Sequence, residues 1–326
     1  MIESRAPGSE LVLGYDGVPE GEVYVLQFLE QRRAPGTPAV RGPGTDVDLL
    51  LVGCSGATAP AVTAPASILL PFRVHLVLPV PADVAAIPRQ VSRKARQQFA
   101  RQRVALDWQL RETADPADFE QFYERFHVPT MRSRHGAAAR TVDRETADLE
   151  LFRNGTLFLM TQRGDPVAGM LCRWARDEGV LTLRLAGIRD ADRVHYASGV
   201  FLGLYLLILE WAVRRGLTAL DLSGCEPFLS KGIFQFKRKL HPRVAWPPDH
   251  FAGKRLVLRA MRDTPDVRDF LVANPVIALE GPAMRAVYFH DDQRPARLDY
   301  RYEGTGLAGH RLEHLDDFLA ATAPCG

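Results

Sequence analysis

The sequence is poor in cysteine and has no metal-binding pattern. Its cysteines, Cys54, Cys172, Cys225 and Cys325, lie far apart along the chain. No two of them form a CxxC pair, and no histidine spacing completes a zinc site. We therefore expect no metal centre and a reducing, cytoplasmic environment.

The sequence also lacks a segment that would target or cross a membrane. Its first ten residues are polar and contain no apolar core of a signal peptide. The most apolar run, 197–213, is interrupted by Glu210 and is shorter than the roughly 20 residues of a spanning helix. We expect this run to form a buried helix.

Neither low hydrophobicity nor a large net charge is present. The chain has 326 residues, of which 46% are hydrophobic and 25% charged, and its formal net charge is +2. These values exclude disorder as the main state and allow a substantial core. The net charge does not identify a partner, because a neutral protein can still carry one basic face.

The chain pattern predicts an α/β protein with a mixed sheet. The first 80 residues read as short strands between Pro- and Gly-rich loops, and residues 81–103 as helical. The elements expected next are a strand at 104–110, a helix that begins after Asp115, a helix at 143–152, strands at 156–162, 167–176 and 180–188, a helix at 197–215 and a strand at 217–222. The last strand should run parallel to its predecessor because a helix crosses between them.

The remaining segments are expected to be mixed. Residues 22–29 have the length and apolar content of a strand, and 297–302 are strand-like. Beyond residue 250 we expect a helix at 265–272, a strand-like piece at 286–289 and a final helix at 310–322.

Two motifs then resemble a known family. The stretch 221–224 reads Asp-Leu-Ser-Gly, and 232–240 reads Gly-Ile-Phe-Gln-Phe-Lys-Arg-Lys-Leu. Together they resemble the D-x-x-G … G-x-x-x-F-K ending of FemABX-like transferases, which are tRNA-dependent aminoacyltransferases, and of their acyl-CoA-using, CelD-like relatives. Residues 92–96, 122–123 and 131–136 are also similar, so the resemblance spans roughly 85–245.

The resemblance implies a GNAT (N-acetyltransferase) domain, with a reduced second GNAT-like half as in tandem FemABX proteins. By this comparison, residues 1–103 are the reduced N-terminal half and 104–250 the GNAT acyltransferase domain. Residues 251–326 would be an extension that packs back on the N-terminal half.

The resemblance also implies transfer of an activated acyl group to an amine or hydroxyl, by direct attack and without a tightly bound cofactor. The stretch 189–199 holds one glycine and lacks the full pyrophosphate loop of acetyl-CoA-binding GNAT domains. Aminoacyl-tRNA is therefore the favoured donor, and acyl-CoA the alternative. The expected acceptor is a small molecule or a peptidoglycan-precursor-like compound, in natural-product or cell-envelope modification.

Two residues are candidates for the chemistry itself. Lys237 follows Phe236 in the second motif, where its charge could stabilise a developing oxyanion or bind a donor phosphate. Asp221 ends a predicted strand and could orient the attacking amine. Composition alone leaves other interpretations open: a solvated lysine in a basic run, and an aspartate that stabilises a turn.

Further residues are candidates for binding the donor. Tyr196, Ser198 and Gly199 precede the long helix, whose first N–H groups suit a phosphate; Ser198 could equally be an ordinary N-cap. Arg93, Lys94 and Arg96 lie in a basic stretch that could follow an RNA backbone or meet coenzyme A phosphates. A solvated helix face is the alternative.

For the acceptor, Arg132, Arg134 and His135 are expected in a polar loop, and Glu226 has less support. Arginine presents a fork of donors to carboxylate or phosphate, although a solvated loop would look the same. A protein of another class also stays open: a GNAT-like binder of an anionic ligand that has lost catalysis.

Overall fold

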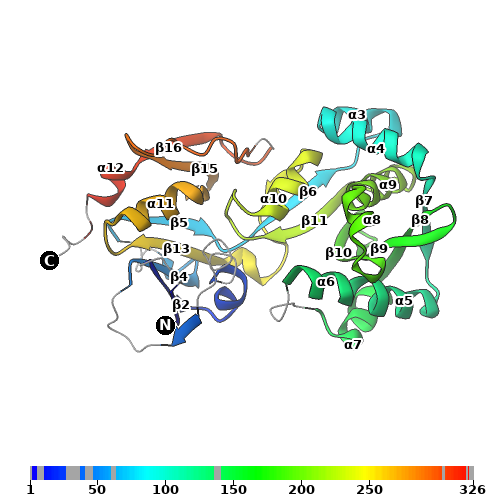
Figure 1. The fold of residues 1–326 in the computed structure, drawn as a ribbon, viewed down its shortest axis with the longest axis horizontal. Helices are drawn as coiled ribbons and strands as arrows, with labels where there is room; N and C mark the ends of the chain where they lie inside the picture. The colour runs from blue at the N-terminus through cyan, green and yellow to red at the C-terminus, as the bar shows by residue number, and fades with distance from the viewer. Residues whose placement is uncertain are drawn as a thin grey trace. The chain divides into compact units, whose positions relative to one another are not determined.

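The computed structural model describes residues 2–5, 11–26, 37–40, 47–59, 64–135, 141–302, 305–320 and 322. The chain divides into two compact units (Figure 1). Unit 1 comprises Met1–His75, Gly224–Arg238 and Val244–Gly326, and unit 2 comprises Leu76–Ser223 and Lys239–Arg243.

This division differs from the three expected domains in where it cuts the chain. Residues 76–103 belong to unit 2, whereas 251–326 share unit 1 with the N-terminal segment. The assignment of GNAT-like halves stays a prediction, because the division itself does not identify unit 1 as a second GNAT copy.

Unit 2 is built on a seven-stranded sheet, and this sheet is mixed, as the sequence predicted. The sheet has the order β12-β6-β11-β10-β9-β8-β7. Neighbours from β7 to β10 are antiparallel, and β10 and β11 are parallel. The strands are β6 (Val74–Pro79), β7 (Trp108–Thr113), β8 (Gly155–Gln162), β9 (Asp165–Ala175), β10 (Val180–Ile188), β11 (Ala219–Cys225) and β12 (Arg243–Ala245).

Helices cover both faces of this sheet. Phe119, Phe122 and Phe126 pack with Leu157 and Leu171 on one face. On the other face, the helix that crosses from β10 to β11 contacts alternate residues, including Phe158, whose ring lies 4.8 Å from that of Trp211. Side chains alternate across a strand. Successive residues of β8, such as Leu157 and Phe158, therefore pack against helices on opposite faces of the sheet.

Two helices begin where the sequence predicts a helix start, whereas the cap at Ser92 was not predicted. Asp115 and Asp143 accept hydrogen bonds from backbone N–H groups in the first turns of their helices, and Ser92 does so for α4. The helical elements of unit 2 are η2 (Val84–Ala86), α3 (Ile87–Gln90), α4 (Arg93–Ala105), α5 (Pro116–Phe122), η3 (Tyr123–His127), α6 (Val128–His135), α7 (Arg144–Thr146), η5 (Ala147–Phe152), η6 (Arg189–Ala191), α8 (Arg193–Ala197) and α9 (Val200–Arg214).

Unit 1 contains a six-stranded sheet with the order β3-β1-β2-β4-β13-β5 and a three-stranded sheet with the order β14-β15-β16. Its core joins Leu13 and Leu51 from early strands to Leu256 and Phe289 from late ones. Its elements are β1 (Ile2–Arg5), β2 (Val12–Gly17), η1 (Glu22–Leu26), β3 (Thr37–Val40), β4 (Leu49–Ser55), β5 (Ser67–Pro71), α10 (Gly232–Lys237), η8 (His250–Gly253), β13 (Lys254–Ala260), α11 (Pro265–Ala273), β14 (Val276–Glu280), β15 (Ala283–His290), β16 (His310–His314) and α12 (Leu315–Leu319). The short helix η7 (Arg238–Leu240) follows α10 and spans the boundary between the units.

Several local predictions were wrong. Residues 22–26 form a π-helix rather than a strand, and 310–314 form a strand rather than the start of a helix. The expected strand at 104–110 begins only at Trp108, because α4 continues to Ala105. In each case tertiary packing overrides a weak local pattern.

Within the described ranges, no helix is long and apolar enough to cross a membrane. The same ranges contain no cluster of His, Cys, Asp and Glu that could hold a metal ion.

Candidate functional site

The parallel pair in unit 2 is short. Only Val180–Thr182 of β10 pair with Ala219–Asp221 of β11, although β10 continues to Ile188. Just beyond, Ser223 adopts a φ of 64° and its hydroxyl donates to the Leu183 carbonyl at 2.5 Å. A left-handed conformation is uncommon for a residue other than glycine. The backbone of Ser223 and its side-chain hydrogen bond therefore mark the point where the β10–β11 pairing ends.

Asp221 lies at the last paired position. It is 4% exposed, and its carboxylate accepts a hydrogen bond from the Ser223 N–H at 2.8 Å. This contact is the turn-stabilising arrangement that was the alternative to a catalytic role. Its catalytic role stays a prediction.

Helix α9 connects β10 to the parallel strand β11, so its N-terminus lies on the side of the carboxyl end of β10. Gly199 is its N-cap with a φ of 84°, and no side chain caps the helix. Ser198 instead donates its hydroxyl to the His195 carbonyl at 2.7 Å, so it does not act as the N-cap of α9. The first N–H groups of such a helix favour an anion.

Helix α4 lies against this point. A Cβ atom built on Gly199 would come within 2.5 Å of Nε2 of Gln98, which belongs to α4. Lys94 and Arg101 flank Gln98 at helical spacing. The exposed cations of this helix are Arg93, Lys94, Arg96 and Arg101. Of the predicted donor-binding cations, Lys94 therefore lies on the side of α4 that faces Gly199, whereas Arg96 donates to the Pro88 carbonyl at 2.5 Å.

The predicted acceptor-binding residues of 132–135 do not lie in a loop. They form the last turn of α6, and Arg132 and Arg134 are exposed; the side chain of His135 lies outside the described part of the structure. The guanidinium carbon of Arg134 is 5.1 Å from the Tyr196 ring centroid and 4.8 Å from that of Phe201. Arg134 therefore contacts a residue that was predicted to bind the donor.

In unit 1, Glu226 is the centre of a buried ion cluster. It is 3% exposed, pairs with Lys231, and has its Oε1 3.8 Å from Nη1 of Arg73. The Arg73 guanidinium lies 4.2 Å from the Tyr24 ring centroid and 5.5 Å from that of Phe251. Burial lowers the pKa of Arg73, because a charged guanidinium is disfavoured away from water.

Lys237 belongs to the same unit and is also buried, at 4% exposure. Burial raises the pKa of the neighbouring Cys225 thiol, while the positive charges of Lys237, Lys231 and Arg73 act to lower it. Burial does not fit the alternative of a solvated lysine, whereas Lys239 of the same basic run is exposed. Lys237 and Asp221 belong to different units.

Sequence reasoning missed Arg73 and Lys231. No local pattern marks them: Arg73 follows the β5 strand, more than 150 residues before its partner Glu226. Lys231 is five residues from Glu226, whereas only the folded chain brings Arg73 to this pair. The one available signal was the absence of an acidic neighbour beside either residue.

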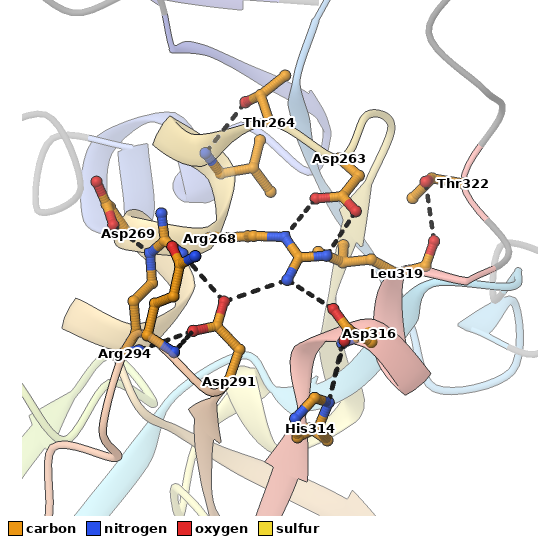
Figure 2. Close-up of polar contacts among 12 residues, drawn as sticks. Asp263, Thr264, Arg268, Asp269, Asp291, Arg294, His314, Asp316, Leu319 and Thr322 are labelled. Carbon is orange, nitrogen blue, oxygen red and sulfur yellow. Dashed lines mark hydrogen bonds and ion pairs between the residues drawn. The ribbon is translucent and has the colours of Figure 1, made fainter.

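A second polar cluster, also missed, lies in unit 1 around Arg268 (Figure 2). Arg268 donates to Asp263 at 2.6 and 2.7 Å, to Asp291 at 3.1 Å and to Asp316 at 2.7 Å. Arg294 also donates to Asp291 at 3.0 Å. The residues border a cavity of about 410 Å³. Both arginines are paired with carboxylates. Their hydrogen bonds connect α11 to the segment after β15 and to α12.

Comparison with known proteins gave matches to solved structures only. No protein-family model matches the chain, and no curated protein matches it. Similar structures include L-PGS from Bacillus licheniformis, with 12% identity, a TM-score of 0.42 and coverage of 81% of this chain and 82% of that one. FemX has 10% identity, a TM-score of 0.45 and coverage of 78% and 82%.

A GCN5-related N-acetyltransferase from Sphaerobacter thermophilus is similar at 14% identity and a TM-score of 0.35, covering 80% of this chain and 76% of that one. FemX and GNAT structures are thus among those that the chain resembles, as its sequence motifs predicted. At these values the likeness carries no argument about donor, acceptor or catalytic residues.

Proposed function

We propose that this chain is an acyltransferase that moves an aminoacyl group from aminoacyl-tRNA to an amine or hydroxyl of a small-molecule or cell-envelope acceptor. The observation that supports this proposal is the position of α4, which carries several exposed cations, beside the uncapped start of α9. Ligands of α/β sheets bind outside the carboxyl ends of parallel strands, and a cationic helix there suits a nucleic-acid backbone.

The proposed reaction is a direct attack. The lone pair of the acceptor nitrogen adds to the ester carbonyl carbon, a C–N bond forms, and the C–O bond to the tRNA ribose breaks. The ribose hydroxyl leaves with the proton that the amine loses. We assign Lys237 to stabilising charge on the carbonyl oxygen and Asp221 to orienting the amine.

The remaining residues are assigned to binding. Arg93, Lys94 and Arg96 would contact donor phosphates, with Ser198 and Gly199 at the start of α9. Arg132, His135 and Glu226 would bind the acceptor. The GNAT-like order of strands in unit 2 supports a transferase and leaves the donor open.

An acyl-CoA donor is the second candidate, and Gly199 favours it. A glycine N-cap with no capping side chain leaves the first N–H groups of α9 without a side-chain acceptor, and such groups bind pyrophosphate in other proteins.

The test is a filter-binding and transfer assay with charged bulk tRNA, acetyl-CoA and longer acyl-CoAs. We expect salt-dependent retention of charged tRNA. A triple variant, R93Q/K94Q/R96Q, should reduce the slope of log affinity against log salt by roughly one unit for each phosphate that the variant no longer neutralises. Arg163→Gln, an exposed change in the β8–β9 turn, is the matched control. Binding and transfer with a CoA ester alone would overturn the tRNA donor.

A further inference from the structure

Tyr196 is exposed in a way that needs an explanation. It lies on α8 with 55% of its surface accessible, and its neighbours hold the ring in this exposed position. Its ring is nearly perpendicular to that of Phe201, at 6.0 Å between centroids and an interplanar angle of 83°. Phe201 itself is 8% exposed and so fixes one edge of Tyr196.

Arg134 completes this arrangement. Its guanidinium carbon lies 5.1 Å from the Tyr196 ring centroid and 4.8 Å from that of Phe201, within the range of a cation–π contact. A buried aromatic edge and an arginine thus hold the tyrosine in place, while more than half of its surface faces solvent.

Besides Arg134, the nearby basic helix α4 supplies cations to the same region of unit 2. Gly199, three residues after Tyr196, is in contact range of Gln98 on the basic helix α4. An exposed aromatic ring in a region that also carries cations is the combination with which proteins bind single-stranded nucleic acid: the ring stacks a base and the cations neutralise phosphates.

We propose that Tyr196, held by Arg134 and Phe201, is a stacking platform for the adenine base of the donor. This inference rests on the proposed function, because both candidate donors carry an adenosine: at the 3′ end of tRNA and in coenzyme A. It moves Arg134 from the predicted acceptor side to the donor side.

The test compares ligands with and without the base. The first pair of probes is the oligonucleotide ACCA and the same oligonucleotide with an abasic 3′ position, each labelled at the 5′ end. The second pair is coenzyme A and 4′-phosphopantetheine. Fluorescence anisotropy measures the first pair and calorimetry the second, so the two arms distinguish the tRNA end from coenzyme A.

In at least one arm, the base should tighten binding by roughly fivefold or more, as stacking on an aromatic side chain does. Tyr196→Ala should abolish that difference, and Tyr196→Phe should retain most of it. Arg134→Gln should reduce it. Val194→Ala is the control, since Val194 lies on the same helix at 74% exposure and should change nothing.

Equal binding of the base-containing and base-free probes in both arms would overturn the platform, and so would a base effect that survives Tyr196→Ala. The transfer assay separates the two proposals. Transfer without a base effect leaves the function and removes the platform. A base effect that depends on Tyr196, without transfer to any acceptor, leaves the platform and removes the function.

Discussion

Glu226 and Arg73 form a buried ion pair whose loss would leave a charge uncompensated. Glu226 and Arg73 are separated by 3.8 Å with side-chain exposures of 3% and 14%, so neither can return to water without unfolding. Buried ions are tolerated when they are paired, and removing one partner leaves the other uncompensated. Substitution of either Glu226 or Arg73 should therefore destabilise the fold, whether or not Glu226 binds an acceptor.

We predict that Glu226→Gln lowers the free energy of unfolding by about 3 kcal/mol, because Arg73 and Lys231 lose their counter-charge. Urea denaturation at pH 7 measures the change. Asp299→Asn, which breaks an exposed pair with Arg297 at 2.8 Å, should cost at most about 1 kcal/mol. Equal losses for the two variants would contradict the argument from burial.

His127 is a second buried titratable residue. It is 2% exposed; its Nδ1 lies 3.0 Å from the Ala186 carbonyl oxygen, and its Nε2 has no hydrogen-bond partner. Burial lowers the pKa of His127, and the Ala186 contact only partly opposes this effect. The folded protein therefore binds the proton less readily than the unfolded chain does.

The sign of the pH effect follows. Below the unfolded pKa of about 6.5, the unfolded state takes up the proton first, so stability is lost as pH falls from that value. One such site can contribute at most about 2 kcal/mol between pH 6.5 and 5. We predict that His127→Asn reduces the loss of stability between these pH values, as measured by urea midpoints. An unchanged pH dependence would rule out His127 as its source.

At the scale of elements, α9 is fitted closely to the sheet. Gly203 lies at the end of its first turn, where a Cβ atom would come 2.6 Å from Cζ3 of Trp108 and 3.0 Å from Cε of Met160. Trp108 is 3% exposed and its ring cannot bend away. A glycine that weakens the helix thus permits its close approach to β7 and β8.

Two opposing effects decide the result of Gly203→Ala. Helix propensity favours alanine by about 1 kcal/mol, whereas overpacking against a rigid buried ring costs about 1–3 kcal/mol. We predict net destabilisation by about 1 kcal/mol in thermal or urea unfolding. Gly232→Ala at the start of α10, where nothing lies within 4 Å, should be neutral or slightly stabilising. Stabilisation by Gly203→Ala would show that the ring yields.

At the scale of the whole molecule, the chain passes repeatedly between the two units. Unit 1 takes three segments of the chain and unit 2 takes two. The Arg268 cluster of Figure 2 joins parts of unit 1 only, from α11 to α12. Its effect on stability should therefore be confined to that unit.

We predict that Arg268→Met accelerates amide hydrogen exchange in α11, α12 and the end of β15, because Asp263, Asp291 and Asp316 all lose a donor. Asp291 keeps Arg294 as a partner, so the expected loss is that of charge-assisted hydrogen bonds, about 1.5–3 kcal/mol for a buried one. Exchange in β8 and β9 of unit 2 should stay as in the wild type. Acceleration throughout both units would instead indicate that they unfold as one.

The sequence by itself determined the middle of the fold. Asp115 and Asp143 start helices, and turns separate the three strands of the meander, because caps, turn residues and periodicity are local properties. The parallel relation of β10 and β11 also followed, since a helix must cross between them. The donor-side residues were found by motif and position, and their roles stay predictions.

Only the tertiary structure decided the rest. It shows a π-helix at 22–26, within the strand expected at 22–29, buries Lys237, and brings Arg73 close to Glu226, which is distant in sequence. It also placed Arg134 against Tyr196. Burial and ion pairing depend on residues distant in sequence, whereas a local pattern records only what its own neighbours require.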